Sequence, residues 1–187
     1  MNITSQNLSL NAGILLFLAP FYTDATKIAR VSLASLLNEA QQVALVTVTL
    51  GTVSENITTC GIQYRASVQN FIKNTKNNES ITFISRFIKH SEIQVGQQYI
   101  VFLNTLSENS GCADNTLEIA HAGYGAMRVD SPYAIDLNYA VRIPLSFVKL
   151  PNAMNPIKGT SSNLQVYESG WVDKQKFIQI LTTPTRQ

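Results

Sequence analysis

The 187-residue sequence contains few of the residues on which most catalytic and cofactor sites depend. It has two cysteines, two histidines and one tryptophan. It contains no nucleophile elbow, no H-E-x-x-H zinc motif and no glycine-rich phosphate loop. We therefore expect no catalytic residues, no metal site, no cofactor and no enzyme activity.

Charged residues are also scarce, at 14% of the chain, and they leave a formal net charge of +2. No two basic residues are adjacent, whereas a protein that binds nucleic acid needs clustered Lys and Arg. We therefore expect no nucleic-acid partner. Apolar residues make up 45% of the chain, which is enough for a single core and too much for a disordered protein.

The longest uncharged apolar run covers residues 12–22, which is shorter than the roughly 20 residues that a membrane-spanning helix needs. A run of this length, followed by Ala25 as a small cleavage residue, is typical of a secretory signal. We interpret residues 1–25 as a signal peptide and residues 26–187 as one exported domain, periplasmic or extracellular, with no stable membrane span. Residues 1–11 contain no Lys or Arg, so a buried helix of a cytoplasmic protein remains the alternative.

The rest of the chain reads as a short helix followed by strands. Helical spacing of leucines predicts a helix over residues 32–39, capped by Ser32. Runs rich in β-branched and aromatic residues predict a meander of four strands over residues 43–50, 59–72, 81–87 and 98–103. In the fourth strand, Tyr99 and Phe102 are expected to point to opposite faces.

The second half of the chain has weaker signals. Strands are expected near residues 124–129 and 139–144, and an irregular connection over residues 151–163, where turn-forming residues dominate. Asp173 followed by Phe177, Ile178 and Leu181 predicts a capped closing helix.

Cys60 and Cys112 are the two cysteines of the sequence, and no group of histidines lies near them that could complete a metal site. In an exported protein such a pair is most simply a structural disulfide. Two cysteines alone cannot supply four tetrahedral zinc ligands. Two unrelated free thiols in a reducing cytosol are the alternative, and that reading depends on the location of the chain.

Two segments carry a family resemblance. Cys60-Gly-Ile-Gln-Tyr64 opens a strand, and Val95-Gly-Gln-Gln-Tyr-Ile-Val-Phe-Leu103 leads into another, after a helix that runs into a β-branched strand. This pattern resembles bacterial exported proteins of netrin-like type, relatives of the amino-terminal domain of tissue inhibitors of metalloproteinases. The resemblance covers about residues 32–112. It implies a mostly β fold, a five-stranded Greek-key barrel of OB type with a short N-terminal helix and a C-terminal helix.

The inhibitory chemistry of that family does not follow from the resemblance. Those inhibitors chelate the catalytic zinc of a peptidase through an amino-terminal cysteine, and no cysteine precedes Cys60 here. We expect a non-enzymatic exported module that binds another protein, a peptidase being one class of partner. The oligomeric state is left open.

Two alternative functions use residues in the second half of the chain. His121, Tyr124 and Trp171 are candidate ligand-binding residues for a carbohydrate or small molecule of the cell envelope, because small residues that could line a groove surround His121. A cysteine-dependent enzyme would instead need Cys112 as a free thiolate held against His121, and a disulfide would abolish it.

Overall fold

The structure is a computed structural model, and it describes residues 29–74, 78–86, 93–106, 111–112, 116–130, 139–158 and 168–183. The expected signal peptide therefore lies outside the described residues, as does Phe87 at the end of the third expected strand. Among the described residues, no helix combines the length and the apolar character needed to cross a membrane.

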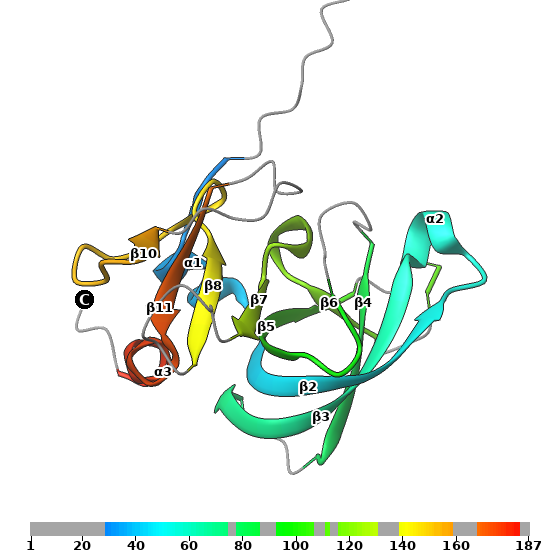
Figure 1. Cartoon of the computed structure of the whole chain (residues 1–187). Coiled ribbons are helices and arrows are strands. Elements are labelled where there is room, and N and C mark those ends of the chain that lie inside the picture. The colour runs from blue at the N-terminus through cyan, green and yellow to red at the C-terminus, as the bar shows by residue number, and fades with distance from the viewer. Residues whose placement is uncertain are drawn as a thin grey trace, which may run out of the picture.

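Five strands close into a barrel (Figure 1). They are β2 (Gln42–Val53), β3 (Ile62–Lys73), β4 (Ser80–Ser85), β5 (Gln98–Thr105) and β6 (Leu117–Ile119). Strand β2 pairs antiparallel with both β3 and β5, and β3 pairs antiparallel with β4. The short β6 closes the barrel, because it pairs parallel with β4 and antiparallel with β5. The expected OB-type barrel is confirmed.

Four more strands, which we call the outer sheet, extend the sheet from the part of β5 that does not pair with β6. In order outward they are β7 (Ala126–Asp130), β8 (Ala140–Pro144), β11 (Ser169–Asp173) and β10 (Ile157–Lys158). Strand β7 pairs with β5 at residues 98–101, whereas β6 pairs with β5 at residues 103–105. Strands β7 and β8 lie close to where the sequence predicts them, and β10 and β11 add to what it predicts. A separate parallel pair joins β1 (Val31–Ser32) to β9 (Val148–Lys149).

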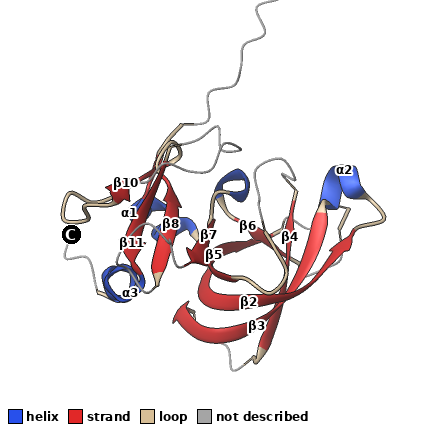
Figure 2. Cartoon of the chain, viewed as in Figure 1, coloured by secondary structure: helices blue, strands red, loops and turns tan. Residues whose placement is uncertain are grey.

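Short helices complete the fold (Figure 2). They are α1 (Leu33–Glu39), α2 (Ile57–Cys60), the 3-10 turn η1 (His121–Gly123) and α3 (Lys174–Thr182). Both predicted N-caps are confirmed, because Ser32 Oγ accepts from the Ser35 backbone N–H at 2.9 Å and Asp173 Oδ1 from that of Lys176 at 2.8 Å.

The carboxyl end of α1 is tied to the barrel by a lysine. Lys73 Nζ, at the end of β3, donates to the carbonyl oxygens of Leu37 at 2.6 Å, Asn38 at 3.1 Å and Ala40 at 2.6 Å. The cation therefore satisfies carbonyl groups that a helix end leaves unpaired, and it opposes the negative end of the helix dipole.

The first half of β2, residues 42–48, and residues 99–103 of β5 are buried on both faces, which explains the nearly continuous apolar sequences there. One face of the pair points into the barrel, with Val46 and Tyr99 as paired examples. The other face, with Val43 opposite Phe102, packs under the apolar sides of α1 and α3. Tyr99 and Phe102 therefore point to opposite faces as expected, and both are buried.

One expected strand start is wrong. The sequence predicts a strand from Thr59, but residues 57–60 form the helix α2, and β3 begins only at Ile62. Gly61 separates the two elements with φ +62° and ψ −132°, a backbone conformation that glycine adopts and other residues avoid. A Cβ on Gly61 would lie 2.0 Å from the Ser85 carbonyl oxygen.

Candidate functional site

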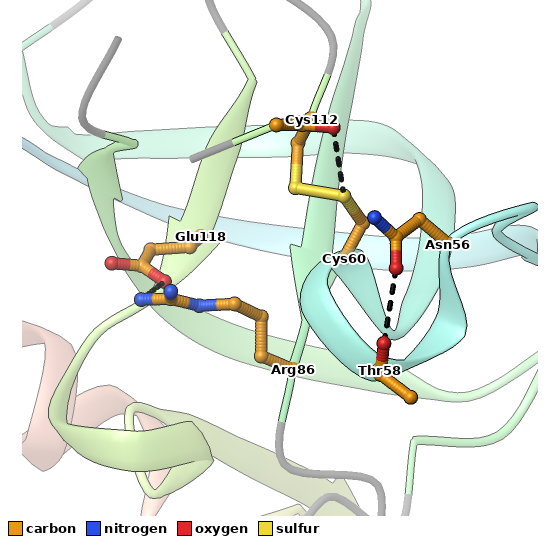
Figure 3. The surroundings of a disulfide bond; sticks show 7 residues. Asn56, Thr58, Cys60, Arg86, Cys112 and Glu118 are labelled. Atoms are coloured by element: carbon orange, nitrogen blue, oxygen red, sulfur yellow. Dashed lines mark hydrogen bonds and ion pairs between the residues drawn. A yellow bond between two sulfur atoms is a disulfide. The ribbon is translucent and has the colours of Figure 1, made fainter. Parts of the chain in front are cut away.

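The structure joins Cys60 and Cys112 in a disulfide, with their Cα atoms 5.7 Å apart (Figure 3). Cys60 ends α2, and Cys112 belongs to the segment between β5 and β6. Ile84 and Leu106 pack around the bond as a small apolar cluster. The described residues include no free cysteine. The disulfide therefore fixes α2 to the side of the barrel.

Polar contacts lie near the disulfide (Figure 3). Arg86 Nη2 lies 2.5 Å from Glu118 Oε2, which links the end of β4 to β6. Both side chains are partly exposed, so the ion pair orients these segments more than it stabilises them. On α2, Thr58 Oγ1 donates to Asn56 Oδ1 at 3.0 Å.

The outer half of β2, helix α2 and the start of β3 form an arm at one end of the barrel (Figure 1). We define the arm as residues 48–65. Strand β5 pairs with β2 only up to Thr47. Beyond it, Val48 exchanges hydrogen bonds with the turn before β5, accepting from Gly96 N–H at 2.8 Å and donating to Gln97 carbonyl oxygen at 3.1 Å. Over residues 49–53, no described strand pairs with this edge of β2.

Exposed apolar side chains gather on the arm and the neighbouring turn. Leu50 is 53% exposed, Val53 is 61% exposed and Ile57 on α2 is 43% exposed. Val95, in the turn before β5, is 57% exposed and lies next to Gly51. Only two other large apolar side chains among the described residues are so exposed, Tyr139 immediately before β8 and Ile157 on β10. Four of the six therefore lie at the arm end of the molecule.

A β-bulge sets the direction of the Leu50 side chain. The register of β2 against β3 shifts between Val48, which pairs with Ala66, and Leu50, which pairs with the exposed Arg65. Thr49 is the extra residue, and its hydroxyl donates to the Arg65 carbonyl oxygen at 3.0 Å. Because of this extra residue, Leu50 points outward although Val46 and Val48 point into the barrel.

The structure brings His121 and Tyr124 together at η1. Their ring centroids lie 6.1 Å apart, and Tyr124 is buried and stacks on Phe147 with centroids 3.6 Å apart. His121 and Ala122 have φ values of 51° and 52°, which residues other than glycine rarely adopt. The His121 Nε2 atom is buried without a hydrogen-bond partner. This strained turn fixes the Tyr124 ring against the fold.

Trp171 lies elsewhere, in the middle of β11. Its indole Nε1 donates to Asp130 Oδ1 at 3.2 Å, and the Arg142 guanidinium carbon lies 5.9 Å from the ring centroid. Asp130 Oδ2 in turn lies 3.6 Å from Arg128 Nε. Trp171 is only 8% exposed. The three residues proposed for ligand binding therefore divide into two places, the η1 turn and the outer sheet.

The described side chains offer little support for cysteine-dependent catalysis or for a metal site. Cys112 is bonded to Cys60, so the free thiolate that a Cys112–His121 enzyme needs is not present. The described residues contain no group of three or more His, Cys, Asp or Glu side chains placed to hold a metal ion.

The exposed apolar residues of the arm were not identified from the sequence. Leu50 follows the apolar run of residues 43–48 that is core, and Val53 and Val95 are single apolar residues between polar residues and glycine, so the sequence alone does not identify them as a group. The available signal was Gly51 inside an apolar strand, which often marks a bulge or a close backbone approach.

No protein-family model matches this chain, and no curated protein matches it.

Proposed function

We propose that the chain is an exported, non-enzymatic module that binds another protein through the arm and the Val95 turn. The observation that carries this proposal is the cluster of four exposed apolar side chains at one end of the barrel. Single exposed apolar residues are normal on protein surfaces, but several gathered on one projecting element favour an interface.

The arm is built to hold these side chains in place. The Cys60–Cys112 bond fixes α2 at its base, and Tyr64 of β3 packs its ring beside Gly51 of β2. An element that is already ordered loses less conformational entropy when it binds. A rigid apolar surface of this kind supports protein binding better than catalysis, which needs convergent polar groups.

Export is part of the proposal. A structural disulfide persists in oxidising compartments and is rare in the cytosol of most cells. The apolar run over residues 12–22 supplies the matching export signal. Together they favour a periplasmic or extracellular location, where a secreted peptidase is the partner class that the netrin-like resemblance suggests.

The carbohydrate alternative has less support from the geometry. Sugar binding through an aromatic ring needs an accessible ring face, and Trp171 and Tyr124 are both buried. We therefore place the binding surface on the arm and not on the η1 turn or the outer sheet.

Comparative capture tests the proposal. The oxidised protein is immobilised and exposed to the soluble proteins of the compartment into which it is exported, beside a Leu50→Glu/Val53→Glu variant. Ile157→Glu, an exposed apolar residue on β10, is the matched control. We expect a protein that the wild type and the control retain and the arm variant loses. Equal retention by all three proteins would contradict the proposal.

A further inference from the structure

On the side of β2 away from β3, none of the described strands pairs with residues 49–53, and these residues carry no charged side chains. Natural proteins normally protect such an edge with Lys, Pro or a covering loop, because unpaired backbone groups recruit another strand. This segment has the sequence Thr-Leu-Gly-Thr-Val, with neither proline nor lysine. The backbone of the edge therefore selects an extended strand as its partner.

We propose that this edge pairs with the same edge of a second copy of the chain, antiparallel about a two-fold axis at Gly51. The proposal rests on the proposed function only in that both require the arm to be a contact surface. It adds a second copy of the chain to the protein partner proposed above for the arm.

The limits of the open edge fit a two-fold pairing. The Gly96 and Gln97 hydrogen bonds to Val48 close the edge on one side. On the other side, β2 itself ends at Val53, and the next residue, Ser54, bonds to the Gly61 carbonyl oxygen on the β3 side of the strand. Between them lie five residues, whose centre is Gly51. A symmetric antiparallel register then pairs residue 49 with 53 and residue 50 with 52.

The charge pattern permits self-association. In a two-fold interface a charged residue near the axis meets its own copy, and like charges directly opposite are destabilising. Residues 49–53 carry no charge. The nearest acidic residue, Glu55, lies beyond the end of β2 and outside this register.

The side chains beside the edge fit the same arrangement. Gly51 contributes no side chain at the axis, where a Cβ would already lie 3.3 Å from the Tyr64 ring and 3.9 Å from Val95 Cγ2. Leu50 and Val53 stand on either side of that position and are both mostly exposed. Leu50 would then lie opposite Thr52 of the second copy and diagonally across the axis from the other Leu50, while Val53 would lie opposite Thr49.

Sedimentation equilibrium of the full oxidised chain, over a wide concentration range, tests the proposal. We expect a monomer–dimer equilibrium that Leu50→Lys/Thr52→Lys weakens by about tenfold or more, because each copy places lysine opposite lysine. Leu50→Glu/Thr52→Glu should do the same. An equimolar mixture of the two variants should restore dimerisation, since Lys then faces Glu at every pair in the register.

Gln175→Lys/Gln179→Lys on the exposed side of α3 is the matched control, and it should dimerise like the wild type. A wild type that stays monomeric would overturn the proposal. Dimerisation that the paired lysines leave unchanged, or a mixture that does not recover, would overturn it as well. If the wild type is monomeric while the arm still captures a different protein, self-pairing fails and the proposed function stands.

Discussion

Removal of the disulfide by Cys60→Ala/Cys112→Ala should cost a large part of the stability of the domain. The two cysteines are 52 residues apart. In the chain-entropy model, a cross-link of that span removes about 14 cal/mol/K from the unfolded chain, or about 4 kcal/mol at 25 °C. For a domain of this size, that loss corresponds to a decrease in Tm of roughly 8–16 °C.

Guanidinium denaturation of the oxidised wild type and the double variant measures this difference. The wild type with its disulfide reduced should unfold like the double variant, because both lose the same constraint. A loss below about 1 kcal/mol would refute the reasoning, since the entropy term would then be missing. It would mean that the unfolded chain already holds these residues close together.

Three further predictions test the fold and the alternative function. Gly61→Ala should lower the free energy of unfolding by about 3 kcal/mol or more in denaturant unfolding, because the added Cβ would overlap the backbone at the end of β4. Gly96→Ala, with open space around it, should lower it by only about 1–2 kcal/mol. Lys73→Met should cost about 1–2 kcal/mol in the same assay through the lost α1 contacts, with exposed Lys149→Met as a nearly neutral control. Titration with cell-wall glycan fragments should leave Trp171 fluorescence unchanged, and a saturable shift would restore the carbohydrate hypothesis.

The barrel could be predicted because its strands have strong local signals. The β-branched run over residues 43–50 predicts β2, which is buried over residues 42–48, and the capping residues Ser32 and Asp173 mark the helix starts. The strands and caps are features that a few neighbouring residues determine. The disulfide followed instead from the presence of two cysteines in a chain that we interpret as exported.

Strands β10 and β11 could not be predicted as well, because they are short and depend on tertiary pairing. Strand β11 contains Gly170, whose Cβ would lie 2.7 Å from Pro156 Cβ and 2.8 Å from Leu145. Glycine weakens a strand pattern, and the close packing that requires it is visible only in three dimensions. The two-residue β10 has no periodicity to detect.

The candidate site was the least predictable feature. His121, Tyr124 and Trp171 were selected as residue types that often bind ligands, and the fold uses two of them as buried packing residues. The arm depends on where the β5 pairing stops, between Thr47 and Val48, and on the bulge at Thr49. Neither a pairing limit nor a bulge has a reliable signature in one sequence.

The central claim is that the arm contacts another protein, and site-specific photo-crosslinking tests it most directly. A photoreactive amino acid replaces Val53 on the arm or, as a control, the exposed Gln179 on α3 in the cells that export the chain. The account predicts a discrete protein adduct from position 53, to a second copy or to another protein, and none from position 179. The absence of an adduct at position 53, or identical adducts at both positions, would contradict it.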